Sequence, residues 1–271
     1  MKKIFAFVLS FQIFAASVCF AAEESIEQKL ADESLTAFLW VETSGEYRAL
    51  CYQAYNTAKE RMDEAVKKHK RKEKPLAVIT DIDETLLNNI PGNQIYIGKD
   101  KSYFRKIWTQ WCAAAVAEPM PGAVDCLKYA AKKKIEVFYV SNRSEKLELE
   151  GTKKNLARLG LPNVDDKHFL LKTAESSKMP RFEKVLKDYE VVIFMGDNIG
   201  DFPLNTEGKL KDERNSFVDN AQKDFGKKFI VFPNPIYGHW ERALAENYQK
   251  LSPEQKENVR RNILKYWFPE E

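Results

Sequence analysis

Two aspartates, Asp81 and Asp83, follow the apolar run Ala77–Thr80 and carry the clearest chemical signal in the chain. Successive side chains of a strand point to opposite faces, so two such carboxylates share one locale only where the strand ends and the chain begins to turn. Burial and mutual repulsion would protonate one of them unless a cation is present. A hard divalent ion such as Mg²⁺ prefers carboxylate oxygens. The segment therefore predicts a metal-dependent site, and a solvated loop with scattered acids is the alternative.

The two aspartates suit a hydrolysis that runs through a covalent intermediate. As a carboxylate nucleophile, Asp81 would form an aspartyl-phosphate, which splits phosphoester hydrolysis into two easier displacements. The neighbouring Asp83 would protonate the leaving oxygen and then activate the water that opens the acyl-phosphate. This pair predicts a phosphomonoester hydrolase.

Phosphoryl transfer also needs groups that neutralise the charge on the phosphoryl oxygens. Ser141 and Asn142 follow a second apolar run and supply hydroxyl and amide donors. The lysine that the reaction requires is predicted to be Lys178, just before a helical segment, and Lys172 is the competing candidate.

Two further carboxylates follow a third apolar run, which ends at Gly196. Asp197 stands at the strand end and is expected to bind the metal directly. Asp201 comes one helical turn later and is expected to hold a metal-bound water or a neighbouring ligand in place. Asp81, Asp83 and Asp197 are thus the predicted metal ligands.

The elements that must position these residues read as buried parallel strands alternating with helices. The expected strands are Leu76–Thr80, Ile135–Ser141, Val191–Gly196 and Phe229–Phe232, and the helices between them are Ala123–Lys132, Lys146–Leu159 and Phe182–Lys187. This alternation predicts an α/β fold, a doubly wound parallel sheet. In such sheets the ligand crevice lies at the carboxyl ends of the strands, where the polar residues should converge.

Helical segments flank this predicted core on both sides. The pattern from Ser25 to Lys70 is helical throughout, and Glu241–Trp267 is helical again. The predicted organisation is a helical segment at 22–74, a phosphatase core at 75–240, and a C-terminal segment at 241–271 that packs with the first as a smaller α-helical appendage.

The first 21 residues have the features of a secretory signal, with a basic start, an apolar centre and small residues at the end. The alternatives are an uncleaved membrane anchor and lipidation at Cys19. The predicted location is the periplasm or cell envelope, as an outer-membrane lipoprotein if Cys19 is modified. Cleavage deletes Lys2 and Lys3 from 43 basic residues and none of the 40 acidic ones, so the net charge falls from +3 to +1. Such a balance gives no reason to expect a nucleic acid polymer as partner.

Three cysteines remain after such cleavage, Cys51, Cys112 and Cys126, an odd number without metal-ligand spacing. At most one intramolecular disulfide is possible, and three buried free thiols are the slightly favoured alternative.

Taken in order, these motifs resemble the haloacid dehalogenase superfamily, and within it the class C bacterial acid phosphatases of the lipoprotein 5′-nucleotidase family. The resemblance runs from about Leu50 to Ala245. It rests on Asp81–Thr85, Trp108-x-x-Trp111, Pro121–Ala123, Val140–Arg143, Gly196–Phe202 and Pro233–Trp240.

The resemblance implies Mg²⁺ held by Asp81, by the backbone carbonyl of Asp83 and by Asp197, with Thr85 and Asp201 supporting the site from behind. Asp81 would then be the nucleophile and Asp83 the acid and base. Ser141, Asn142 and Lys178 would grip the phosphate of a small phosphomonoester. A homodimer is a further possibility.

Three aromatic residues, Trp108, Trp111 and Tyr237, could sandwich a nucleobase, since a flat π-face stacks on any base. The alternative for each is core filling, and His239 beside them is expected to be a surface or hydrogen-bonded residue. The predicted activity is hydrolysis of nucleoside 5′-monophosphates and other phosphomonoesters. A broad acid phosphatase without base preference, or a non-catalytic binding or storage protein, are the alternatives.

Overall fold

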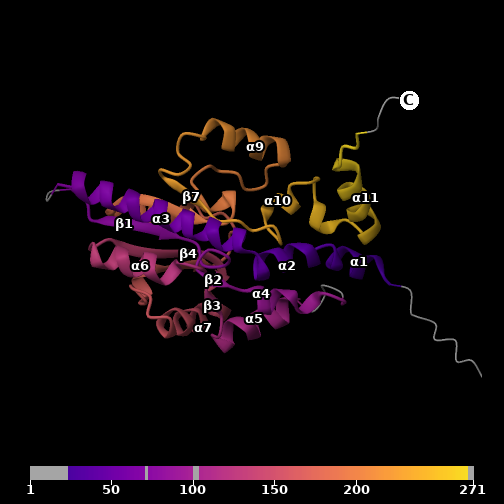
Figure 1. Ribbon diagram of the computed structural model, residues 1–271, viewed down its shortest axis with the longest axis horizontal. Coiled ribbons are helices and arrows are strands. Elements are labelled where there is room, and N and C mark those ends of the chain that lie inside the picture. The colour runs from indigo at the N-terminus through magenta and orange to yellow at the C-terminus, as the bar shows by residue number, and fades with distance from the viewer. Residues whose placement is uncertain (1–23, 71–72, 100–103, 268–271) are drawn as a thin grey trace, which may run out of the picture.

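A parallel sheet of five strands forms the centre of the computed structural model, which describes residues 24–70, 73–99 and 104–267 (Figure 1). The strands are β1 (Leu76–Thr80), β4 (Glu136–Ser144), β5 (Phe169–Lys172), β6 (Glu190–Gly196) and β7 (Phe229–Val231), in the order β5-β4-β1-β6-β7. All four pairings are parallel. The chain runs outward from β1 to one edge and then returns to build the other, so the predicted doubly wound α/β fold is confirmed.

Each face of the sheet is covered by helices. On one face, α3 (Gly45–Lys68), α6 (Ala123–Lys132) and α7 (Glu145–Arg158) pack over one set of strand side chains, and on the other α8 (Met179–Asp188) packs over the alternate set. In β1, for example, Val78 belongs to the first cluster and Ala77 and Ile79 to the second. Because both faces are buried at the centre of the sheet, the strand β1 is buried at every position and apolar up to Thr80.

The remaining elements are short and surround this core. They are α1 (Ile26–Asp32), α2 (Leu35–Thr43), β2 (Leu87–Asn88), α4 (Ile90–Asn93), α5 (Phe104–Ala114), β3 (Glu118–Pro119), α9 (Lys211–Asn220), α10 (His239–Arg242) and α11 (Pro253–Ile263), with 3₁₀ turns η1 (Gln94–Tyr96), η3 (Asp166–His168), η4 (Ile199–Asp201) and η5 (Tyr248–Lys250). The strands β2 and β3 pair as a separate antiparallel ribbon.

The flanking segments differ from the prediction of unbroken helices. Ser44 adopts an extended conformation between α2 and α3, and its side chain accepts a hydrogen bond from the backbone of Tyr47 at 3.1 Å. Serine competes for backbone hydrogen bonds in this way, so it ends one helix and caps the next. In the C-terminal segment, Ser252 and Gln255 form a capping box that starts α11. The edge strand β5 was not predicted, and its residues are only alternately buried.

The two flanking segments meet in space, since α1 and α11 are in contact. Arg260 on α11 donates to the carbonyl of Leu30 at 3.3 Å and forms ion pairs with Glu33 and Glu241. Of the described residues, no helix has both the length and the apolar character to span a membrane. The predicted signal segment, Cys19 included, lies outside the described residues.

The three remaining cysteines, Cys51, Cys112 and Cys126, are buried free thiols. Burial raises the pKa of all three. They therefore act as small apolar side chains of the core.

Candidate active site

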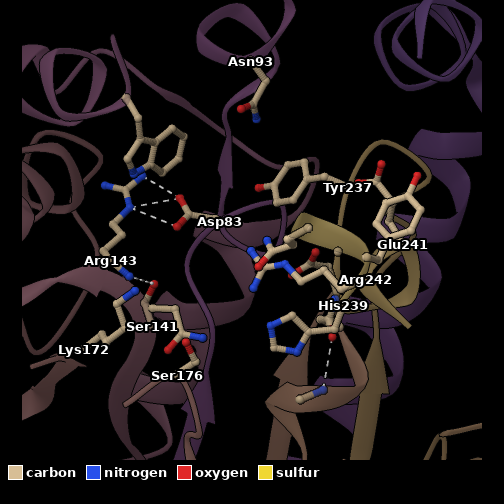
Figure 2. A pocket seen from close by; sticks show the side chains of 18 of the residues that line it. Asp83, Asn93, Ser141, Arg143, Lys172, Ser176, Tyr237, His239, Glu241 and Arg242 are labelled. Atoms are coloured by element: carbon tan, nitrogen blue, oxygen red, sulfur yellow. Dashed lines mark hydrogen bonds and ion pairs between the residues drawn. The ribbon is translucent and has the colours of Figure 1, made fainter. Parts of the chain in front are cut away.

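A cavity of about 1270 Å³ opens at the carboxyl ends of the central strands, where the C-terminal segment closes over the sheet (Figure 2). It collects most of the residues singled out from the sequence. Among the residues lining it are Asp81, Asp83, Trp108, Ser141, Asn142, Lys172, Lys178, Asp197, Asp201, Tyr237 and His239.

Asp81 and Asp201 share one buried ammonium group. The Nζ of Lys178 lies 2.6 Å from Oδ1 of Asp81 and 2.7 Å from Oδ1 of Asp201, and each of the three side chains is less than 10% exposed. Burial raises the pKa of Asp81 to about 7, and the charge of Lys178 opposes that rise. Lys178 is the N-cap residue of α8, and this end of the helix lies at the cavity, so Lys178 lines it.

Asp201 is held in place by a close backbone approach. Its Oδ2 accepts a hydrogen bond from the backbone of Asn198 at 2.8 Å. A Cβ at Gly196 would lie 2.2 Å from the Cβ of Asp201. Glycine is therefore required at the end of β6, because any side chain there would displace the carboxylate.

Three carboxylates meet at this point, since Asp81, Asp197 and Asp201 each offer an oxygen within 4.8 Å of the others. Burial, reinforced by the charges of Asp201 and Asp81, raises the pKa of Asp197 well above its ordinary value. One ammonium leaves two of the three negative charges unbalanced, and a hard divalent cation, which prefers such oxygens, would balance them. The donor set fits a divalent metal ion.

Asp83 has a different environment from Asp81, although the two are separated by one residue. The buried guanidinium of Arg143 donates to its carboxylate from Nε (3.0 and 3.2 Å) and from Nη2 (2.7 Å), as Figure 2 shows. Asn89 adds a further bond at 2.8 Å. Each aspartate thus has its own cation, and the side chain of Asp83 is turned away from the three-carboxylate cluster.

Ser141 and Asn142 are fixed by a second buried arginine. Arg181 donates to the carbonyl of Ser141 at 2.5 Å and to Oδ1 of Asn142 at 2.7 Å. The amide nitrogen of Asn142 is the end of the side chain that Arg181 does not contact. Both residues line the cavity, so a hydroxyl and an amide are available there.

Tyr237 lines the cavity, and its hydroxyl donates to the carboxylate of Glu84. Glu84 is buried, follows Asp83 directly and adopts φ +51°, which is uncommon for a residue other than glycine. Its other oxygen accepts from the backbone of Asn89 at 3.0 Å. Tyr237 thereby ties the segment between β7 and α10 to the turn that carries the two aspartates.

The two tryptophans lie in different places. Trp108 lines the cavity, and the guanidinium of Arg143 stands 5.5 Å from the centre of its ring. Trp111 does not line this cavity: its Nε1 donates to Oδ1 of Asn89 at 2.8 Å, and its ring covers Gly92, where a Cβ would come within 2.6 Å. Its position agrees with core filling, the alternative weighed for each aromatic residue.

Thr85 lies behind the metal ligands, with its hydroxyl 3.4 Å from Oδ1 of Asp197. His239 lies 3.3 Å from Glu207, and burial lowers its pKa.

Several residues of the site were missed from the sequence as site residues. Asn234 donates to Oδ2 of Asp197 at 2.8 Å, and the others are Glu84, Asn89, Arg143 and Arg181. Glu84 and Asn89 stand within a few residues of the aspartates, which was the available signal. The two arginines also stand near predicted residues, Arg143 after Asn142 and Arg181 three residues after Lys178, but the groups that they contact, Asp83 and Ser141, lie far from them in sequence.

Comparison with known proteins agrees with this geometry. The family model for the haloacid dehalogenase superfamily, subfamily IIIB (acid phosphatase), matches residues 11–240. The crystal structure of class C acid phosphatase from Bacillus anthracis with tungstate bound is 40% identical, with a TM-score of 0.84, and the match covers 89% of this chain and 100% of that one. A second structure of the Bacillus anthracis enzyme matches with the same identity and coverage and a TM-score of 0.83.

The fold and the site thus define a hydrolase of phosphomonoesters. The chain belongs to the acid phosphatases of the haloacid dehalogenase superfamily, as its motifs indicated. Enzymes of this superfamily use a divalent metal, and the three-carboxylate cluster is able to bind one.

Proposed function

We propose that this chain is an exported, Mg²⁺-dependent acid phosphatase that hydrolyses nucleoside 5′-monophosphates and other small phosphomonoesters through a phospho-aspartyl intermediate. The observation that carries the proposal is the position of Asp81. It directly follows the central strand β1, shares the ammonium of Lys178 with Asp201, and opens on a cavity large enough for a nucleotide.

In this mechanism the side chains of the cavity divide the work. Asp81 attacks phosphorus, while Lys178, Ser141 and Asn142 bind the phosphoryl oxygens. Asp83 gives its proton to the leaving oxygen and then takes one from the attacking water. Mg²⁺, when bound by Asp81, Asp197 and the backbone carbonyl of Asp83, would supply positive charge beside the phosphoryl group.

The contact between Asp83 and Arg143 bears on this role. An ionised Asp83 suits the guanidinium, which donates to both of its oxygens. To protonate a leaving group, Asp83 must rotate away from Arg143 or hold the proton on Oδ2, which accepts only the 3.2 Å bond from Nε. Arg143 thus has a positioning function in the proposal. The bound tungstate of the Bacillus anthracis enzyme supports an oxyanion site in this fold.

Metal removal tests the cofactor. We expect exhaustive chelation to abolish phosphate release and Mg²⁺ to restore it, because the three-carboxylate cluster otherwise repels an anionic substrate. The measurement is phosphate release by protein whose metal content is followed by mass spectrometry. Full activity in a preparation shown to be free of divalent metal would contradict the proposal.

Base recognition is assigned to Tyr237, with Trp108 as the second aromatic residue of the cavity. We expect Tyr237→Ala to lower kcat/KM for AMP by a factor that corresponds to a free energy of about 1–3 kcal/mol, the range for one base–aromatic stack. The loss should fall on KM rather than kcat, because the contact is equal in the ground and transition states. Ribose 5-phosphate, which has no base, should be unaffected.

Tyr237→Phe is the matched control, because it keeps the ring and removes only the hydroxyl that bonds Glu84. It should retain the preference for AMP. Equal losses on AMP, ribose 5-phosphate and an aryl phosphate in Tyr237→Ala would show that Tyr237 supports the turn at Glu84, and the function would then be a broad acid phosphatase.

A further inference from the structure

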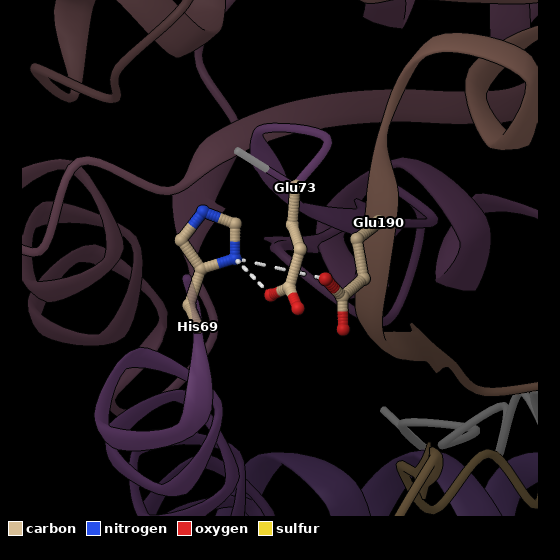
Figure 3. Close-up of side chains that lie close together, drawn as sticks. All are labelled: His69, Glu73 and Glu190. Atoms are coloured by element: carbon tan, nitrogen blue, oxygen red, sulfur yellow. Dashed lines mark ion pairs between the residues drawn. The ribbon is translucent and has the colours of Figure 1, made fainter. Parts of the chain in front are cut away.

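A second group of potential metal ligands lies at the opposite end of the sheet from the active site. It consists of His69, Glu73 and Glu190 (Figure 3). His69 directly follows α3, Glu73 lies shortly before β1, and Glu190 is the first residue of β6. The three side chains are 24%, 43% and 55% exposed. They are among the residues lining a depression of about 1100 Å³.

The distances between these ligand atoms match a metal site better than hydrogen bonds. Nδ1 of His69 lies 3.5 Å from Oε2 of Glu73 and 3.6 Å from Oε2 of Glu190. An N–H···O hydrogen bond spans about 2.7–3.2 Å. Two metal–ligand bonds of about 2.0–2.1 Å at the tetrahedral angle place their donor atoms about 3.4 Å apart.

A buried atom that forms no hydrogen bond points into this gap. Nδ1 of His69 is shielded from solvent and forms no hydrogen bond, and Figure 3 shows it directed toward both carboxylates. Leaving a buried nitrogen without a partner costs about 1–3 kcal/mol. A metal ion bound to Nδ1 would remove that cost.

The backbone around the group is held by bonds independent of any metal. The backbone nitrogen of Glu190 donates to the carbonyl of Pro75 at 2.9 Å, and that of His69 donates to Ala65 at 2.9 Å. The backbone nitrogen of Glu73 donates to the carbonyl of Lys70 at 3.0 Å. The three ligands therefore approach one point from three fixed segments.

Basic side chains also line the depression, namely Arg61, Lys68, Lys74, Lys227 and Lys228. Two of them are engaged elsewhere: Arg61 pairs with Glu64 at 3.2 Å, and Lys74 donates to the carbonyl of Leu186 at 2.9 Å. Two carboxylates and a neutral imidazole carry a charge of −2, so the complex of these ligands with one divalent cation is neutral.

We propose that His69, Glu73 and Glu190 form a second divalent metal site, distinct from the catalytic cluster and selective for Zn²⁺-like ions. An imidazole nitrogen with two carboxylate oxygens suits Zn²⁺, whereas Mg²⁺ takes oxygen ligands. A water completes the tetrahedron. The ion connects the end of α3 to the starts of β1 and β6, and it stabilises the end of the sheet that is remote from catalysis.

The test is a Zn²⁺ titration of the whole protein after chelation and reloading with excess Mg²⁺. Bound metals are measured by mass spectrometry after gel filtration, and the unfolding temperature is followed in parallel. The wild type should bind an equivalent of Zn²⁺ that His69→Ala and Glu190→Gln lack, and Zn²⁺ should raise the unfolding temperature of the wild type alone. Loss of a residue that only hydrogen-bonds a metal ligand weakens metal binding by about 10–100-fold. Loss of a direct ligand should therefore weaken Zn²⁺ binding by more than that.

Glu64→Gln is the matched control, because Glu64 lines the same depression but pairs with Arg61. It should bind Zn²⁺ like the wild type. Zn²⁺ that exchanges into the active site should bind to His69→Ala as it does to the wild type. The second site is therefore measured by the Zn²⁺ that the wild type binds in excess of His69→Ala. Phosphatase activity with Mg²⁺ should be unchanged in all three variants. Zn²⁺ binding by His69→Ala equal to that of the wild type, or no such binding by the wild type, would overturn the proposal.

Discussion

Asp81→Asn should lower kcat/KM by at least about 10⁴-fold, the scale of losses when a nucleophile is removed. The amide is close in shape to the carboxylate and still accepts a hydrogen bond from Lys178, but it cannot form an acyl-phosphate. The unfolding temperature of the metal-free variant should be equal to or above that of the wild type. Burial raises the pKa of Asp81 to about 7, so the folded protein disfavours the charge that the substitution removes.

The measurement is steady-state phosphate release, together with mass spectrometry of enzyme quenched in acid during turnover. The wild type should carry a phosphoryl group on the peptide that contains Asp81, and the variant should carry none. Asp188→Asn, at the exposed end of α8, is the control and should behave as the wild type. Retention of more than about a hundredth of wild-type activity would exclude the covalent mechanism.

Lys178→Met should lower kcat by about 10²–10³-fold, as loss of one group that stabilises transition-state charge does. It should also destabilise the metal-free protein by about 3–5 kcal/mol, because Asp81 and Asp201 then remain buried without their cation. Added Mg²⁺ should recover part of the stability but not the rate. Phosphate release and denaturant unfolding, each with and without Mg²⁺, measure the two effects.

Lys172→Met is the matched comparison, since it makes the same change at the other lysine of the cavity. Lys172 is partly exposed at the end of the edge strand β5, so its loss should cost far less in rate and stability. If Lys172→Met is as inactive as Lys178→Met, the assignment of the phosphate-binding lysine to Lys178 is wrong.

Local patterns were sufficient to predict the core of the fold. The apolar runs before Asp81, Ser141 and Asp197 are continuous, and a run buried on both faces has few structures open to it besides a central parallel strand. Since such strands meet at their carboxyl ends, the convergence of these residues followed from the pattern alone. The cavity bears out that convergence.

The boundaries of the flanking helices were harder to predict, because each depends on a hydrogen bond to the side chain of one capping residue. Ser44 and Ser252 end or begin helices through their side chains, and a periodic apolar pattern continues across such a residue without a break. The strand β5 is an edge strand with two half-buried residues, so its burial arises from pairing with β4 rather than from composition.

The amino-acid sequence thus identifies the chemical groups at the strand ends and the class of reaction that they suit. The pairing of these groups depends on how the chain packs in three dimensions. Lys178 reaches Asp81 across 97 residues of chain, and Arg143 reaches Asp83 across 60. The spacing of residues along a chain carries no information about such contacts, because they form only when separate strands and helices pack around one cavity.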